Sequence, residues 1–247
     1  MQYEDLIFEV RNGVAWIIIN RPEKMNSFCG KTCEELIQAL YKAGYDKDIG
    51  AIVLAGAGDR AFCTGGDQSE HDGNYDGRGT IGLPMEELHT AIRDVPKPVI
   101  TRVQGYAIGG GNVLCTICDL TICSEKAIFG QVGPKMGSVD PGYGTAFLAR
   151  VVGEKKAREI WYMCRRYSGQ EAAAMGLANV CVPHDQLTLK YKNGAIATTA
   201  AFPGTRTIAA ICARRAVPRA TPQAASSRST STQARFAPSM KVATAFH

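Results

Sequence analysis

The 247-residue sequence contains no long apolar run, and it has no acidic residue from position 189 onward. None of its apolar stretches approaches the roughly 20 residues that span a bilayer, so we expect no membrane-spanning helix. The first ten residues, MQYEDLIFEV, are acidic and strand-like, and we expect no signal peptide there. These absences favour a cytoplasmic protein without a membrane partner.

Several motifs that would indicate other functions are missing. The sequence has no GKS or GKT, and GGGNVL does not match the GxGxxG spacing, which argues against a phosphate loop and a dinucleotide fingerprint. The nine cysteines are scattered, and no second pair completes a metal site with Cys115 and Cys118. The four histidines show neither metal-ligand spacing nor a Ser/His/Asp arrangement. We therefore predict reduced thiols and no bound metal.

The charge is unevenly distributed along the chain. Residues 1–188 have a net charge of −4, whereas residues 189–247 have a net charge of +9. Although a basic tail is typical of nucleic-acid binding, the stretch TPQAASSRSTSTQARFAPS is of low complexity and shows no amphipathic period. We expect no nucleic-acid partner, one short helix over Ile208–Val217, and poor order after Pro218.

The order of apolar patterns predicts an α/β fold with a largely parallel sheet, because strand and helix patterns alternate along the chain. A composition that is 45% apolar is sufficient for one domain with a sizeable core. The predicted strands are 6–10, 14–19, 49–55, 99–103, 120–124, 127–129 and 178–182, and the predicted helices are 32–43, 85–92, 145–152, 155–164 and 169–175.

Two glycine-rich turns are the strongest functional signal. VQGYAIGGGNVLCTICD, residues 103–119, has three consecutive glycines before a helical pattern, and AFCTGGD, residues 61–67, has Gly65 and Gly66. A strand that turns through glycines into a helix leaves backbone N–H groups exposed at the helix N-terminus. Two such junctions can aim one N–H each at a single oxygen, as in an oxyanion hole. Tight helix–strand packing is the alternative explanation of the glycines.

Candidate acid–base residues lie in two loops. Asp140 is the only acid in the loop 130–144, near Ser138, and is either a general base or a turn aspartate. Asp67 is interpreted as an N-cap and Asp119 as a structural residue at a helix end. Tyr75, in the polar loop 68–82, is the tyrosine most able to reach a substrate.

Five motifs in order along residues 3–187 resemble the crotonase (enoyl-CoA hydratase/isomerase) superfamily. They are RPEKMNSF, AFCTGGDQ, GYAIGGGNVL, DLTICSEKAIFGQVGPKMGS and REIWYMCRRYSGQEAAAMGLANVCVP. The resemblance implies a ββα spiral core of the ClpP-like type and a homo-oligomer, a trimer or a hexamer built from trimers. It also implies an acyl-CoA substrate whose thioester carbonyl is held by the N–H groups of Gly66 and Gly110. Binding of the CoA ester is implied for Lys24, Phe62, Gly65 and Asp67.

The hydratases of this superfamily have two catalytic glutamates, and the matching positions here are Val113 and Gly133. GGDQ, FGQVGPK and GSVDPGYG instead resemble a branch whose members open a cyclic β-keto thioester with water or form 1,4-dihydroxy-2-naphthoyl-CoA. In that branch the aspartate matching Asp140 is catalytic, and the serine matching Ser138 lies beside it. The resemblance also suggests bicarbonate at Gln131 and Gly133, and no other cofactor.

The expected activity is ring opening of 2-ketocyclohexanecarboxyl-CoA to pimelyl-CoA, a reaction of anaerobic benzoate degradation. The alternatives are the naphthoyl-CoA synthase and a catalytically impaired acyl-CoA-binding protein. The last is considered because residues 188–247 lack the pattern of the family's C-terminal helices and of the tyrosine that they carry. We therefore expect a catalytic core over residues 1–187 and an atypical basic tail over 188–247, and hypothesise that a frameshift produced the tail.

Overall fold

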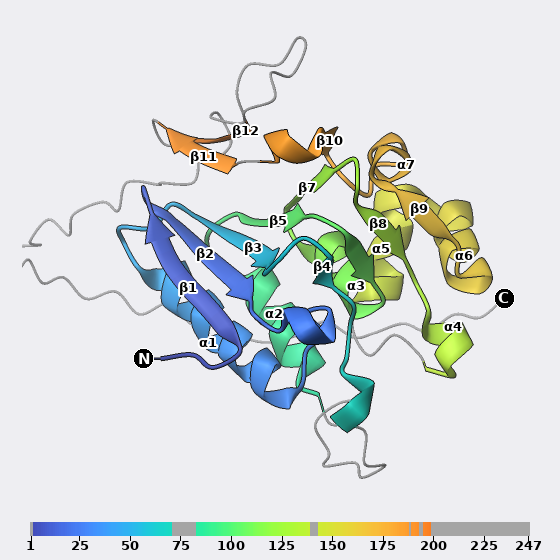
Figure 1. Cartoon of the computed structure of the whole chain (residues 1–247), viewed down its shortest axis with the longest axis horizontal. Coiled ribbons are helices and arrows are strands. Elements are labelled where there is room, and N and C mark those ends of the chain that lie inside the picture. Colours follow the sequence, from blue (N-terminus) through green and yellow to red (C-terminus); the bar gives the residue numbers. More distant parts are fainter. Residues whose placement is uncertain (1, 71–82, 139–142, 188, 193–194, 199–247) are drawn as a thin grey trace, which may run out of the picture. The chain divides into compact units, whose positions relative to one another are not determined.

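The computed structural model describes residues 2–70, 83–138, 143–187, 189–192 and 195–198 (Figure 1). Its larger sheet has six strands in the order β1-β2-β3-β5-β7-β10. The β1–β2 pair is an antiparallel hairpin that turns at Asn12 and Gly13, both with positive φ, and all other neighbours are parallel. The largely parallel α/β sheet is therefore confirmed. The strands are β1 (Leu6–Arg11), β2 (Val14–Ile19), β3 (Ala51–Gly56), β5 (Val99–Val103), β7 (Leu120–Ser124) and β10 (Val180–Val182).

A second sheet of four short strands has the order β4-β6-β8-β9. Its first three strands are parallel, and the last is antiparallel to β8. Only β8 corresponds to a predicted strand, because β4, β6 and β9 were not recognisable from a local apolar pattern. The strands are β4 (Ala61–Cys63), β6 (Tyr106–Ile108), β8 (Ile128–Gly130) and β9 (Arg166–Ser168).

The helices follow the predicted order, with small shifts at their ends. In the predicted loop 130–144 the structure forms a short helix, α4. After Gly66, the described residues Gln68–Glu70 form a 3-10 turn. Further 3-10 turns are Pro22–Lys24 and His184–Gln186. The helices are α1 (Gly30–Tyr45), α2 (Met85–Asp94), α3 (Gly110–Ile117), α4 (Gly133–Met136), α5 (Gly144–Val152), α6 (Glu154–Met163) and α7 (Gly169–Ala174).

The apolar core lies on both faces of the six-stranded sheet. In β3 all six residues are buried, with Ile52 and Leu54 in the large cluster that includes α1, and Ala51 and Val53 in a smaller cluster on the other face. A parallel strand that is covered on both sides is expected to be apolar throughout. The core therefore holds β3 and β5 in place. The glycine turns follow these strands in the chain, one after β3 and β4 and the other after β5 and β6.

The segment beyond Leu187 is described only in part. It contains the antiparallel strands β11 (Leu189–Lys192) and β12 (Ala195–Thr198), which were not predicted. The predicted helix 208–217 and the expected disorder after Pro218 lie outside the described residues.

Other features are reported for the described part of the chain only. No described helix is long and apolar enough to cross a membrane. Eight cysteines are free thiols, and no group of three or more potential metal ligands is found among the described side chains.

Candidate functional site

The two glycine turns meet at the ends of neighbouring strands. β4 and β6 pair in parallel, and the chain then turns through Gly65 and Gly109, which have φ values of +89° and +57°. A Cβ at Gly65 would lie 2.9 Å from the N of Gly110, and a Cβ at Gly110 would lie 3.2 Å from the Cα of Gly65. Because the backbones approach this closely, glycine is required on both sides.

The local backbone leaves one N–H on each turn unused. Gly110 is the first residue of α3, so its N–H has no partner within the helix. Gly66 forms a parallel bridge with Phe28, in which the Phe28 N–H donates to the Gly65 carbonyl and the Asp67 N–H donates to the Phe28 carbonyl, both at 2.9 Å. In this pattern the N–H of Gly66 itself points away from Phe28.

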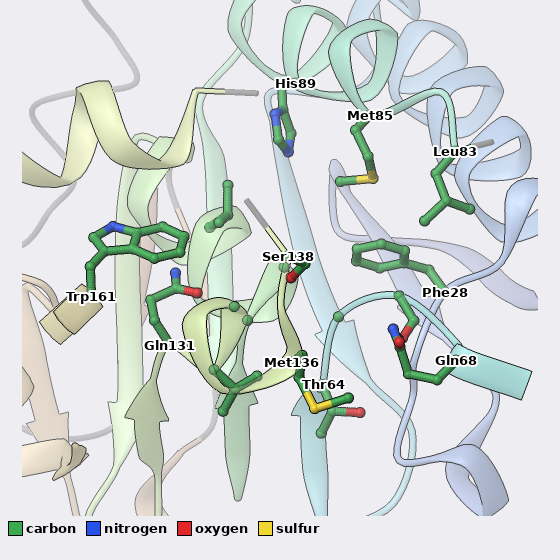
Figure 2. A pocket seen from close by; sticks show the side chains of 17 residues that line it. Phe28, Thr64, Gln68, Leu83, Met85, His89, Gln131, Met136, Ser138 and Trp161 are labelled. Atoms are coloured by element: carbon green, nitrogen blue, oxygen red, sulfur yellow. The ribbon is translucent and has the colours of Figure 1, made fainter. Parts of the chain in front are cut away.

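Both glycines line a cavity of about 290 Å³. Figure 2 shows His89 and Met85 on the α2 side, Trp161 and Gln131 at one end, and Phe28 and Gln68 at the other. Most of the lining is apolar, with a few polar groups, as in small-molecule sites. The lining residues are Phe28, Thr64, Gly65, Gly66, Gln68, Leu83, Met85, His89, Gly109, Gly110, Val113, Gln131, Val132, Gly133, Met136, Ser138 and Trp161.

The wall formed by α4 leaves little room for a side chain at Gly133. A Cβ there would lie 3.1 Å from the Ser138 carbonyl oxygen and 3.2 Å from Cζ3 of Trp161. The Ser138 N–H donates to the Gly133 carbonyl at 2.9 Å and closes the short helix. At Gly133 the wall of the cavity therefore consists of backbone and the edge of the Trp161 ring, and it carries no carboxylate.

Comparison with known proteins identifies the family. The enoyl-CoA hydratase/isomerase family matches residues 9–230. The chain belongs to the enoyl-CoA hydratase/isomerase (crotonase) family. The match includes part of the segment 188–247, whose boundary as a separate domain stays a prediction.

Two solved structures illustrate the relationship. An enoyl-CoA hydratase from Bacillus anthracis is 30% identical, with a TM-score of 0.67, over 74% of this chain and 72% of that chain. An enoyl-CoA hydratase/carnithine racemase from Magnetospirillum magneticum is 28% identical, with a TM-score of 0.70, over 75% of this chain and 71% of that one. The predicted crotonase fold class is confirmed, and the family processes acyl-CoA substrates.

The structure gathers most of the predicted site residues of this crotonase around one cavity. Asp140 and Tyr75 lie outside the described residues, and their roles stay predictions. Ser138, the described residue closest in sequence to Asp140, lines the cavity. The other predicted residues that line the cavity are Gly65, Gly66, Gly110, Gln131 and Gly133.

Three predicted CoA-binding residues are not part of the cavity lining. The side chain of Phe62 is fully buried in the core, so any contact from this residue must come from its backbone. Lys24 is half-exposed and donates to the Ser69 hydroxyl at 2.9 Å. Asp67 is buried, and its Oδ1 accepts from the Ser69 N–H at 3.0 Å, which agrees with its interpretation as an N-cap.

Asp119 and Cys63 have structural roles and take no part in catalysis in our interpretation. Oδ2 of Asp119 accepts from the Val99 N–H at 2.9 Å, as expected for a structural residue after a helix. Burial raises the pKa of Cys63 to about 12, although the Gly65 N–H that donates to its sulfur acts in the opposite direction. Cys63 therefore stays a neutral thiol beneath the glycine turn.

Sequence reasoning missed two polar residues of this crotonase cavity. His89 is fully buried on α2, four residues after Met85 on the same face, and its Nδ1 accepts from the Tyr143 N–H at 3.4 Å. Trp161 packs against the core and also lines the cavity. His89 could have been recognised from the sequence, because it is a histidine on the buried face of an amphipathic helix.

Among the described residues, Nε1 of Trp161 and Nε2 of Gln131 have no hydrogen-bond partner. Both residues line the cavity, but these two nitrogen atoms are themselves buried. A buried donor without an acceptor is costly.

Proposed function

We propose that this crotonase cleaves a carbon–carbon bond in a cyclic β-keto thioester and opens 2-ketocyclohexanecarboxyl-CoA to pimelyl-CoA with water. The observation that carries the proposal is the absence of a carboxylate among the described residues that line the cavity. Val113 and Gly133 occupy the positions of the two hydratase glutamates, which argues against simple hydration of an enoyl thioester. The acid–base role then falls to Asp140, two residues after Ser138.

The proposed mechanism assigns one role to each group. Asp140 takes a proton from water, which adds to the ring ketone. The tetrahedral adduct collapses, the bond between the former ketone carbon and the α-carbon breaks, and its electron pair forms a thioester enolate. The N–H groups of Gly66 and Gly110 hold the enolate oxygen, each contributing about 2.7–4 kcal/mol. Asp140 returns the proton to the α-carbon, which leaves the open-chain thioester and a carboxylic acid that releases its proton to solvent.

A second candidate is 1,4-dihydroxy-2-naphthoyl-CoA synthase, which performs a related Claisen-type step in the opposite direction. The observation that favours it is that Gln131 and Gly133, where the resemblance suggests bicarbonate, both line the cavity. A bicarbonate ion held by these two residues would supply the base for this reaction.

The test is a thioester assay with 2-ketocyclohexanecarboxyl-CoA beside o-succinylbenzoyl-CoA, on the wild type and on Asp140→Asn. We expect ring opening of the first ester and its loss in the variant. Asp48→Asn, which changes an exposed aspartate, is the matched control and should retain wild-type turnover.

Each alternative has its own result in this assay. Turnover of o-succinylbenzoyl-CoA alone would replace the hydrolase by the synthase. Binding of both esters without turnover of either would indicate an impaired acyl-CoA-binding protein.

A further inference from the structure

Arg21 connects two segments that are far apart in sequence and lie behind the glycine turn. Its Nη1 donates to the Ser27 carbonyl at 2.7 Å, and its Nη2 donates to Oδ2 of Asp67 at 2.9 Å. The side chains are largely buried, with 12% of Arg21 and 6% of Asp67 exposed. The guanidinium group therefore holds a backbone carbonyl and a carboxylate at the same time, as its planar fork allows.

These two anchors flank the bridge that orients Gly66. Ser27 immediately precedes Phe28, and Asp67 immediately follows Gly66. Within the bridge, Phe28 donates to the Gly65 carbonyl, and Asp67 donates through its N–H to the Phe28 carbonyl. The direction of the Gly66 N–H is thus set by a short stretch of backbone that Arg21 holds at both sides.

We infer that Arg21 is a positioning residue that, through Asp67 and the Ser27 carbonyl, keeps the Gly66 N–H aimed into the cavity. The inference rests on the proposed role of Gly66 as a donor to the thioester carbonyl. Arg21 itself is not among the residues that line the cavity. Its effect is transmitted by the backbone, so it is not a catalytic residue.

Among the described residues, no second cation duplicates this arrangement. Lys24 also lies near Asp67, at 3.7 Å from Oδ2, but its side chain is 44% exposed and it donates to Ser69. A single ammonium group also cannot reproduce the two fixed donor directions of a guanidinium group. Lysine at position 21 should therefore restore the function of Arg21 only in part.

The loop that carries Arg21 is also held by contacts that do not involve the Arg21 side chain. These contacts should keep a variant of Arg21 folded. The Arg21 N–H donates to Oδ1 of Asn26 at 3.1 Å, and Nδ2 of Asn26 donates to the carbonyls of Ala57 and Ala61 at 2.9 and 2.8 Å. These bonds do not use the guanidinium group. We expect Arg21→Met to fold, because methionine retains the apolar stem and the loop retains Asn26.

The test measures polarisation of the thioester carbonyl. Cyclohexanecarboxyl-CoA labelled with ¹³C at the thioester carbonyl lacks the ring ketone and cannot be opened, so its carbonyl infrared band reports only on the donors. In the wild type the band should shift to lower wavenumber on binding. In Arg21→Met more than half of this shift should be lost while the ester still binds, and Arg21→Lys should give an intermediate shift.

Turnover provides the second readout. For Arg21→Met we expect kcat to fall about tenfold or more, less than the 10²–10³-fold that follows loss of a whole donor, with a much smaller change in KM. Asn179→Ala is the control, because it removes the acceptor for the Thr121 N–H on another strand pair and should leave the band and kcat unchanged.

The outcomes separate this inference from the proposed function. A full carbonyl shift in Arg21→Met with bound ester would overturn the positioning role, whatever the enzyme's substrate. A wild-type shift that depends on Arg21, in a protein that opens no ring ester, would support the positioning role and reject the hydrolase. An unshifted band in the wild type would reject Gly66 as a donor, and the inference with it.

Discussion

At the scale of single residues, the site depends on positions that have no side chain. A Cβ at Gly111 would lie 2.0 Å from the Cys63 carbonyl oxygen, and one at Gly110 would lie 2.5 Å from Cζ of Phe28. The first contact is with backbone, which cannot move aside, whereas the second is with an aromatic ring that is almost fully buried. Gly111 is therefore required for folding, and Gly110 is required above all for the shape of the cavity.

We expect Gly110→Ala to lower kcat by about 10²-fold or more, because the new methyl group displaces Phe28 and the N–H of residue 110. The free energy of unfolding should fall by about 1–3 kcal/mol, as for other overpacked sites. Gly30→Ala is the control, since a Cβ there meets nothing within 4 Å. Wild-type kcat in Gly110→Ala would contradict the proposed role of this turn.

Asp67 gives a second prediction at this scale, which concerns pH. Burial alone would raise its pKa, but hydrogen bonds from Ser69 and Arg21 outweigh burial and hold the pKa below its usual value. The carboxylate therefore stabilises the fold above its unfolded-state pKa of about 3.9, and this contribution is lost as the pH falls through the lower pKa of the folded state.

Asp67→Asn should lower the free energy of unfolding at pH 7 by an amount on the order of 3 kcal/mol, because it removes one partner of a buried ion pair. The difference from the wild type should shrink on acidification below about pH 4. Urea unfolding at several pH values measures it. A difference that is the same at pH 7 and pH 3 would show that the carboxylate does not act through its charge.

At the scale of elements, short pieces of structure depend on capping and on their neighbours. The six-residue helix α7 begins with a capping box, in which the Glu171 N–H donates to the Ser168 hydroxyl at 3.2 Å and the Ser168 N–H donates to the Glu171 carboxylate at 2.7 Å. A helix this short is unstable by itself, so its cap and its packing beside β9 and β10 determine whether it forms.

Ser168→Ala should therefore cost about 0.5–2 kcal/mol in the free energy of unfolding, whereas Ser168→Thr should cost much less because it retains the hydroxyl. Thermal or urea unfolding of the two variants measures the difference. Because no residue of α7 lines the cavity, kcat should stay at the wild-type value in both variants. Equal stability of the alanine and threonine variants would show that the hydroxyl contributes nothing.

The same contrast explains what the sequence could predict about the fold. Helices such as α1 and strands such as β2 and β3 carry patterns long enough to be recognised, and they were placed within two residues. β4, β6 and β9 have three residues each and exist because a neighbouring strand supplies their partners. Pairing of this kind depends on contacts that no local pattern contains.

The site divides along the same line. The two glycine turns that line the cavity could be recognised from the sequence, because glycines before a helical pattern are distinctive, and their role as donors stays a prediction. His89 and Trp161 were not, since each needs a helix to be docked before its side chain reaches the cavity. Phe62 was predicted to bind the CoA ester because it lies close to the turn in sequence. In the structure its side chain is fully buried and does not line the cavity.

At the scale of the whole molecule, members of the family are typically oligomeric. Two large apolar residues at the end of α6, Tyr162 and Met163, are 74% and 63% exposed. Exposed apolar groups of this size are typical of surfaces that another subunit covers. We expect the protein to sediment as a trimer or a hexamer. A monomer at micromolar concentration in analytical ultracentrifugation would contradict this expectation.

The basic segment from residue 188 onward gives a further prediction at this scale. If the frameshift hypothesis is correct, tryptic peptides from the natural source should match residues 206–241 only after a change of reading frame. Peptides that match the sequence as written would reject the hypothesis and show that the acid-free tail is genuine.

The pairing of β4 with β6 has a consequence for how such a chain can change over generations. The two turns follow adjacent hydrogen-bonded strands, so the separation of their N–H groups is tied to the strand spacing of about 4.8 Å. Substitutions at lining positions such as 131 or 138 alter other parts of the cavity and leave this spacing intact. A duplicated gene can thus acquire a new cavity lining one side chain at a time while the two glycine turns stay where they were.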